Sequence, residues 1–400
     1  MVKIKNKIVI IYIFFMMILS AMCDNVRGPF VPIIKQEFSV NNKGIATTIM
    51  MCTLGYMIFT FIGGILCEKV GQKKVFNYGF IFIIFAATVL YFSKSFILYL
   101  IALFLLNSGQ ALVCIGTNTL IPIISIGFQA ILMNLTHFSY GIGATFTQRF
   151  TGIMLYNGVT WRQIYLLIAI ISFIIFIGFL FVNIPEAHIL KENTINHKEV
   201  FKNKLVYMYM LAMGFYVAAE MNTGSWFVNF MHDVYKYDEK GSSVYAALFF
   251  GTFTLGRLLG GLVVEKIGFI KSVLYSVTLG TILQIIGLIL GESTMVIISI
   301  SGLFFSITFP TLILSISKVF KQNTSYITGI VITAGSLMSM LVNLLIGVMN
   351  DLIGVYKTYY LIPICLGLCA IFVFIIYNNT MRNSTLNFRR KQCLERPMEE

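Results

Sequence analysis

The amino-acid sequence predicts an all-α membrane protein with twelve transmembrane helices arranged as two six-helix bundles. The first supporting observation is a nine-residue phrase that occurs twice, as GGILCEKVG from Gly63 to Gly71 and as GGLVVEKIG from Gly260 to Gly268. The copies begin 197 positions apart, and each closes one long apolar run and opens the next. We therefore interpret the second half of the chain as a duplicate of the first, an organisation typical of transporters.

The second observation is the composition. Apolar residues make up 58% of the 400 positions and charged residues only 11%. A soluble domain could not hide so much apolar surface, so we expect a lipid bilayer around most of the chain and a multi-pass protein of the cell membrane. The net charge of +13 does not indicate a nucleic-acid partner, because Lys and Arg lie between the apolar runs and form no single basic face.

The third observation is the number of apolar runs. Twelve stretches are long enough for about 20 helical residues each. They cover residues 8–33, 45–66, 75–92, 95–121, 129–155, 164–183, 205–231, 244–264, 272–290, 294–317, 325–349 and 359–377. The connector from Pro185 to Lys204 is rich in charge. We predict an N-terminal bundle over residues 1–184, a cytoplasmic linker over 185–204, a C-terminal bundle over 205–378 and a cytoplasmic tail over 379–400.

Basic residues in the connecting segments predict the orientation. If the amino terminus is cytoplasmic, the inner segments carry 19 Lys and Arg residues and the outer loops carry seven. Short cytoplasmic loops hold the excess of basic residues in membrane proteins. Both termini are therefore expected in the cytoplasm, which requires an even number of crossings.

The repeated phrase resembles the signature of the major facilitator superfamily. That signature lies between the second and third helices and contains a Gly, an acid, a base and a second Gly, followed by further basic residues. The first copy supplies Gly64, Glu68, Lys69, Gly71, Lys73 and Lys74, with Glu68 where the family usually has Asp, and the second supplies Gly261, Glu265, Lys266, Gly268 and Lys271. Paired glycines allow helices to approach closely, and the last Gly allows a tight turn. The resemblance implies a major facilitator fold in which these residues form a gate.

Within that superfamily the chain is similar to the fucose permease and bacterial hexose branch of sugar:proton symporters. The similarity lies in YVAAEMNTGSW (Tyr216 to Trp226), NLTHFSYGIGA (Asn134 to Ala144) and GRLLGG (Gly256 to Gly261). It implies a monomeric carrier whose partners are a small-molecule substrate, protons and lipid.

Two carboxylates inside apolar runs are candidates for proton coupling. An ionisable group in a membrane helix costs about 2.5 to 3.5 kcal/mol on insertion scales. The presence of such a group therefore indicates a structural or functional role. Adding the repeat offset of 197 to Asp24 leads to position 221, beside Glu220, which places the two acids at matching depth. Glu220 could load and unload a proton, or be a permanently ionised structural group. For Asp24 a fixed salt bridge to Arg27 or Arg149 is favoured, with proton coupling second.

Other polar side chains in the apolar runs are candidates for substrate binding. His137 could bind substrate or relay a proton, although a packing role is favoured for a lone membrane histidine. Arg257 is expected to clamp helix ends or snorkel. Asn222 and Trp226 share one face of the seventh run, Asn107 and Gln110 share one face of the fourth, and Asn134 lies near the start of the fifth. Amides and an indole suit a neutral polyol, although polar residues also join membrane helices and Trp226 could be an interface anchor.

The sequence lacks the motifs of several other functional classes. The sequence has no nucleotide-binding P-loop, no metal-ligand spacing and no recognisable nucleophile beside a base, so we expect no cofactor, no metal and no enzyme activity. The favoured hypothesis is proton-coupled uptake of a small neutral solute such as a monosaccharide. A proton-coupled drug or metabolite exporter of the same fold is the alternative, and a non-transporting receptor or scaffold is the third, which the acids within the apolar runs disfavour.

Overall fold

The described part of the chain is built from helices joined by short turns. The computed structural model describes residues 7–40, 42–125, 127–185, 197–237, 239–320 and 322–394, and these contain no β-strand. The first half contains α1 (Lys7–Asn25), α2 (Arg27–Glu37), α3 (Asn42–Val70), α4 (Gln72–Phe92), α5 (Phe96–Ile124), α6 (Gln129–Tyr156) and α7 (Trp161–Leu180). The second contains α8 (His197–Lys202), α9 (Lys204–Tyr235), α10 (Glu239–Ile267), α11 (Phe269–Leu290), η1 (Glu292–Thr294), α12 (Met295–Phe305), α13 (Thr308–Val319), α14 (Thr324–Ile353), α15 (Val355–Tyr359) and α16 (Leu361–Leu394).

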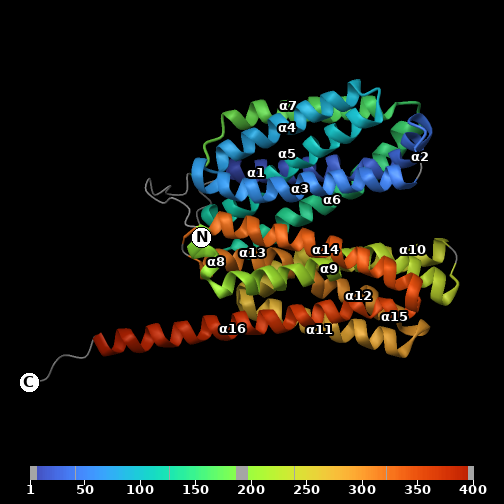
Figure 1. The fold of residues 1–400 in the computed structure, drawn as a ribbon. Helices are drawn as coiled ribbons and strands as arrows, with labels where there is room; N and C mark the ends of the chain where they lie inside the picture. The colour runs from blue at the N-terminus through green and yellow to red at the C-terminus, as the bar shows by residue number, and fades with distance from the viewer. Residues whose placement is uncertain are drawn as a thin grey trace, which may run out of the picture.

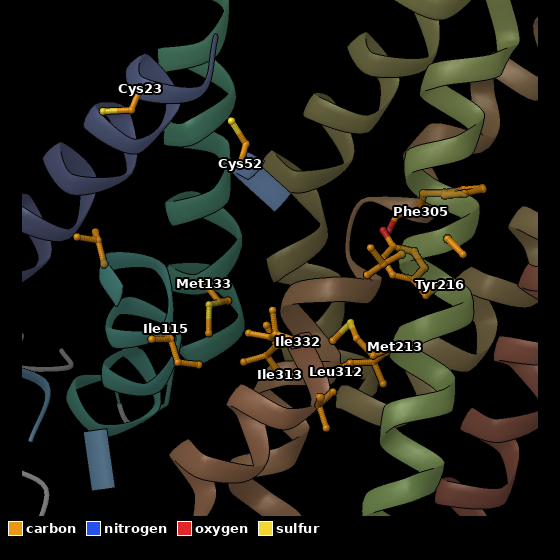
Figure 2. Packing of buried hydrophobic residues seen from close by; sticks show 14 of the residues in the cluster. Cys23, Cys52, Ile115, Met133, Met213, Tyr216, Phe305, Leu312, Ile313 and Ile332 are labelled. Atoms are coloured by element: carbon orange, nitrogen blue, oxygen red, sulfur yellow. The ribbon is translucent and has the colours of Figure 1, made fainter. Parts of the chain in front are cut away.

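The helices form two groups that lie side by side (Figure 1). In the first group α5 packs against α3 and α4, and α1 packs against α6. In the second group α9 packs between α14 and α16, and α12 packs against α10 and α11. The groups meet where α3 contacts α14 and where α6 contacts α10. Met133 of α6 also lies near Ile313 of α13 in the buried core, as Figure 2 shows.

Ten helical spans within the described residues are long and apolar enough to cross a membrane. The helices α6 and α9 are not among them, although they contain 28 and 32 residues. Both carry polar side chains such as Asn134 and His137 on α6 and Glu220 and Asn222 on α9, which lower their hydropathy. The protein is therefore an all-α membrane protein in which the two long helices without a qualifying span, α6 and α9, lie at the junction of the groups and within the second group.

Three of the predicted runs have a short helix break within them or at their start. The break between α1 and α2 precedes Pro29, the break between α12 and α13 precedes Pro310, and the break between α15 and α16 precedes Pro363. Proline has no backbone N–H and crowds the carbonyl four residues earlier, so the helix bends or ends there. The predicted runs 8–33 and 294–317 therefore contain a short break, the run 359–377 has one at its start, and each run lies mostly within one candidate membrane span.

The predicted linker and tail are only partly covered by the structure. Residues 186–196 of the linker lie outside the described residues, and α8 (His197–Lys202) forms its last part. The last helix was expected to end near residue 377, but α16 continues to Leu394 and extends past its neighbours (Figure 1). Residues 395–400 of the predicted tail lie outside the described residues. The bundle boundaries at 184, 205 and 378 stay predictions.

Candidate functional site

Both copies of the repeated phrase end in a glycine with a backbone conformation that other residues rarely adopt. Gly71 has a φ of 82° and Gly268 a φ of 94°. Each residue immediately precedes a new helix, α4 and α11 respectively. Glycine has no Cβ and tolerates positive φ without steric strain. The tight turn predicted for this position is present in both copies.

The acid of each copy binds the first turn of a helix in the opposite group. A Glu68 carboxylate oxygen accepts a hydrogen bond from the backbone N–H of Ser325, at the start of α14, over 2.6 Å. A Glu265 carboxylate oxygen accepts one from the backbone N–H of Ala130, at the start of α6, over 2.8 Å. A helix N-terminus has unpaired N–H groups and a positive dipole, so a carboxylate there forms a charge-assisted cap. We call this end of the molecule the signature end, and the other the distal end.

The glycines of the phrase bring backbones of the two groups together beside these caps. A Cβ placed on Gly64 would lie 2.9 Å from the Ser325 carbonyl oxygen and 3.0 Å from the Cα of Gly329. A Cβ on Gly261 would lie 2.6 Å from the Cα of Ile131. Only glycine allows such approach, so the close helix contact predicted for this phrase is present and joins the groups.

The basic residues of the phrase do not join the groups. The Lys73 ammonium donates to the backbone carbonyl of Leu180, at the end of α7, over 3.3 Å, within the first group. Lys69 and Lys266 are exposed. The acids and glycines therefore form the contact between the groups at the signature end.

Asp24 is held by two neighbours. The Arg27 guanidinium donates to one carboxylate oxygen over 2.5 Å, and the Tyr140 hydroxyl of α6 donates to the other over 2.8 Å. Arg27 is one of the two partners expected from the sequence. Arg149, the other, is exposed and makes no described ion pair with Asp24. Both oxygens of Asp24 are thus occupied by hydrogen bonds.

Glu220 has a weaker restraint. Its side chain on α9 is buried, with 8% of the residue exposed, and its nearest cation is Arg257 on α10, whose Nη2 lies 3.8 Å from a carboxylate oxygen. That distance is beyond hydrogen-bond range, so the attraction is ionic. The Arg257 guanidinium also lies 4.3 Å from the ring centre of Phe253. Arg257 therefore serves as the counter-ion of a buried acid, a role that its predicted function as a helix clamp did not include.

His137 connects α6 to this pair. The Arg257 charge acts on the His137 ring, which is 7% exposed and lies edge-on to Phe309 of α13 with 5.5 Å between ring centres. Asn134, one turn earlier, donates its side-chain N–H to the Ala130 carbonyl, and its Oδ1 lies 4.0 Å from where a Cβ of Gly260 would be. Residues of both groups therefore meet around Arg257.

The remaining candidates lie within one group or the other. The Asn107 side-chain N–H donates to the Leu103 carbonyl, and that of Gln110 donates to the Ser20 carbonyl of α1. The Asn222 side-chain N–H donates to the Ala218 carbonyl. The half-buried Trp226 donates its indole N–H to Asn343 of α14 over 2.7 Å, which restrains the ring. The structure therefore does not bring all predicted binding residues into one cluster.

Several buried polar atoms of these residues have no hydrogen-bond partner within the described part of the protein. They are Gln110 Oε1, Asn134 Oδ1, His137 Nε2, Asn222 Oδ1 and Arg257 Nε. Buried polar atoms in proteins are nearly always hydrogen-bonded, so unpaired ones in both groups are suited to a polar ligand. Four are potential acceptors and one is a donor, a combination that matches hydroxyl groups.

Some residues of these sites could not be recognised from the sequence. Tyr140 is one of 20 tyrosines, and its bond to Asp24 joins positions 116 residues apart. The helix starts that Glu68 and Glu265 cap are backbone groups and carry no side-chain signal. Asn343, which holds Trp226, lies in an otherwise apolar stretch of α14.

A second polar network, at the distal end of the first group, was also not predicted. Glu37 forms an ion pair with Arg162 and accepts a hydrogen bond from the Trp161 indole over 2.6 Å. Arg162 also donates two hydrogen bonds, of 3.0 and 2.7 Å, to the Ser93 carbonyl. Burial by itself raises the pKa of Glu37, but the bonds from Arg162 and Trp161 outweigh it, so this pKa lies below its usual value. The network connects α2, the end of α4 and α7.

We expect Glu37→Gln to lower the thermal stability of the protein slightly at pH 7. Side chains of Arg162 and Glu37 are 27% and 32% exposed, so solvent screening limits the pair to about 0.5 to 1 kcal/mol. Because folding lowers the pKa of Glu37, this stabilisation is present above the unfolded pKa of about 4.3 and is lost as the pH falls through the folded value.

The measurement is the thermal unfolding midpoint in detergent, followed by tryptophan fluorescence at several pH values. The difference in unfolding midpoint between wild type and Glu37→Gln should disappear below about pH 4. Asp351→Asn, an exposed acid at the same end, is the matched control and should leave the midpoint unchanged. If this difference in midpoint stays the same in acid, the ion pair of Glu37 with Arg162 does not contribute to stability.

Comparisons with known proteins agree with this architecture. The family model described as Major Facilitator Superfamily matches residues 13–342. A glucose/galactose transporter of Brucella abortus is 25% identical over 362 residues, covering 86% of this chain and 87% of the relative. The crystal structure of FucP, a major facilitator transporter, in the outward conformation matches with a TM-score of 0.79 at 16% identity and covers 92% of this chain and 99% of that one.

A second crystal structure, of the Escherichia coli fucose:proton symporter FucP, gives a TM-score of 0.80 at 16% identity, with 92% of this chain and 98% of that chain covered. At this identity the structural matches establish the fold. The family match extends over most of the chain, through both copies of the repeated phrase. The chain therefore belongs to the Major Facilitator Superfamily and is a membrane transporter, not an enzyme.

Proposed function

We propose that this transporter takes up a small neutral solute, most specifically a monosaccharide, together with protons. The observation that carries the proposal is the buried Glu220 beside Arg257, in a protein whose two groups both have unpaired buried polar atoms. A buried acid with one loosely placed counter-ion is suited to gaining and losing a proton during transport. The names of the Brucella relative, a glucose/galactose transporter, and of the fucose:proton symporter support the substrate class.

The proposal includes twelve transmembrane crossings. Ten spans meet the length and hydropathy criteria, and α6 and α9 supply two more if their polar faces line the solute path instead of facing lipid. With twelve crossings both termini lie on one side, and the excess of basic residues places that side in the cytoplasm. The two bundles, divided within residues 185–204, then act as the moving bodies of a monomeric carrier in the cell membrane.

Glu220 is the preferred coupling acid over Asp24. Both oxygens of Asp24 are hydrogen-bonded, by Arg27 and Tyr140, whereas the Arg257 guanidinium is 3.8 Å from Glu220. Protonation of Asp24 would weaken two charge-assisted bonds, one of them in a close ion pair, whereas the ion pair of Glu220 with Arg257 is longer than a hydrogen bond and costs less to lose. Release of Arg257 would then alter the contact between α9 and α10.

The two caps at the signature end indicate how access alternates. Glu68 and Glu265 hold the bundles together at that end, which the proposed orientation places in the cytoplasm. The solute would then enter from the distal end. Release to the cytoplasm requires both caps to break.

The test is uptake of radiolabelled glucose, galactose and fucose into liposomes that contain the purified protein, under an inward proton gradient. Accumulation of at least one sugar that a protonophore abolishes is expected. If no sugar accumulates and the protein instead expels a cationic amphiphile, the exporter alternative replaces this proposal.

We expect Glu68→Gln and Glu265→Gln each to loosen the signature end, and the double variant to loosen it further. A neutral amide still accepts a hydrogen bond but loses the charge that favours a helix N-terminus, which is worth about 0.3 to 1 kcal/mol per site. Hydrogen exchange of the first turns of α14 and α6, which contain the capped amides of Ser325 and Ala130, should accelerate. Asp351→Asn at the distal end is the control. Unchanged exchange in the double variant would show that the caps do not hold this end closed.

A further inference from the structure

A groove on the surface of the second bundle is unconnected with the solute path. It lies between α11 and α16, on the side of the molecule away from the first bundle (Figure 1). Its volume is about 600 Å³, and its walls include Tyr275, Leu279, Ile371 and Phe374. Its lining is almost entirely apolar. This face is turned toward the lipid if the helices span the membrane as proposed.

Small residues on α16 create the hollow. Ala370 lines the groove together with the larger side chains of Ile371 and Phe374. One turn away, Gly367 is open enough that a Cβ would only just reach Thr281 of α11, at 4.0 Å. A larger residue at position 370 would therefore fill the groove without having to enter the core of the bundle.

The end of the groove nearest the signature end carries positive charge. The Lys271 ammonium, one turn before Leu274 on α11, lies 6.0 Å from the ring centre of Tyr377, one turn after Phe374 on α16. Exposed Lys266 ends α10 nearby, and the Lys318 ammonium lies 5.9 Å from the ring centre of Phe269 at the start of α11. Among the described residues, none of these three lysines forms an ion pair with a carboxylate.

We propose that this groove binds one anionic phospholipid, with an acyl chain between α11 and α16 and the phosphate at Lys271. Residues 271 to 279 rise about 12 Å along α11, close to the depth of one leaflet of a hydrocarbon core about 30 Å thick. An apolar slot that ends at an unpaired cation matches the two parts of an anionic lipid. With the proposed orientation, the lipid belongs to the cytoplasmic leaflet.

A second copy of this chain is a poorer occupant. A stable protein interface buries about 1,200 to 2,000 Å² and presents a broad complementary surface, whereas this groove is one narrow slot between two helices. A flexible acyl chain can fill such a slot without a matching surface.

The experiment measures lipid retention by native mass spectrometry of the intact protein, titrated with dioleoylphosphatidylglycerol or dioleoylphosphatidylcholine. Wild type should retain one phosphatidylglycerol in preference to phosphatidylcholine. Lys271→Gln should weaken phosphatidylglycerol binding about fivefold, equivalent to about 1 kcal/mol, and remove the preference. Ala370→Phe should abolish binding of both lipids at this site.

Matched controls are Lys204→Gln, an exposed lysine at the start of α9, and Ile81→Phe, an exposed apolar position on α4. Neither should change lipid retention. A cooperative thermal unfolding transition is the check that Ala370→Phe is folded. Equal affinities of wild type and Lys271→Gln would overturn the proposal. Displacement of the lipid by glycerol phosphate, or a dimer that Ala370→Phe dissociates, would also overturn it, in favour of a phosphate site or a second copy of the chain.

Discussion

Replacement of Glu220 by Gln is expected to abolish proton-driven accumulation of solute, while exchange of solute across the membrane persists. Glutamine keeps the size and polarity of the side chain but cannot carry a proton or attract Arg257. Because an applied proton gradient can do work only through a group that is loaded on one side and unloaded on the other, the internal solute concentration should not rise above the external one. Solute bound by the unpaired amide and imidazole atoms can still cross in exchange.

The measurement compares gradient-driven uptake and gradient-free counterflow in the same liposomes. Asp233→Asn, an exposed acid near the end of the same helix α9, is the control and should retain both activities. If Glu220→Gln accumulates solute normally while Asp24→Asn does not, Asp24 is the coupling acid. If both variants accumulate solute, the mechanism of coupling proposed for this protein is wrong.

Replacement of Gly329 by Leu is expected to prevent closure of the signature end and to reduce uptake more than tenfold. A Cβ on Gly329 would lie 3.0 Å from the Cα of Gly64 and 3.0 Å from the carbonyl oxygen of Thr60. These are backbone atoms of α3 and cannot turn aside as a side chain could. Overpacking costs about 1 to 3 kcal/mol, which would shift the balance between closed and open states about 5- to 150-fold toward the open state.

The matched control is Gly347→Leu, on the same helix α14, where an added Cβ would meet nothing within 4 Å. Both substitutions change helix propensity in the same way. A difference in uptake between the two variants therefore measures the effect of crowding the contact between α14 and α3. Uptake should fall, and hydrogen exchange at the starts of α14 and α6 should rise, in Gly329→Leu alone. Equal uptake by the two variants would show that the approach of Gly64 and Gly329 is not required for the transport cycle.

The repeated phrase was the most informative part of the sequence, and its physical interpretation was correct where it depended on local geometry. Gly71 and Gly268 make the predicted turns because positive φ is a property of one residue. The partners of Glu68 and Glu265 could not be predicted, because they are backbone amides more than a hundred residues away. The prolines at 29, 310 and 363 were visible in the sequence, yet hydropathy averaged over 20 residues cannot distinguish a broken helix from a continuous one.

The candidate site was predicted less completely than the fold. The sequence indicated which polar residues lie inside apolar helices, since each is costly in lipid and stands out by composition. It could not indicate that Tyr140 and Arg27 occupy both oxygens of Asp24, or that the ion pair described for Glu220 is the longer one with Arg257. It also placed Asn107, Gln110, Asn222 and Trp226 in one binding set, although each is bonded within its own group.

By itself the sequence determined the helical character of this protein, its duplication, its preference for lipid and the residue types available for coupling, because these depend on composition and on periodicity along the chain. Only the tertiary structure decided which acid is hydrogen-bonded on both oxygens, which helix starts the signature acids cap, and which face of the second bundle has an apolar groove with lysines at one end. Those properties depend on distances between helices, and residues far apart in the chain set them together.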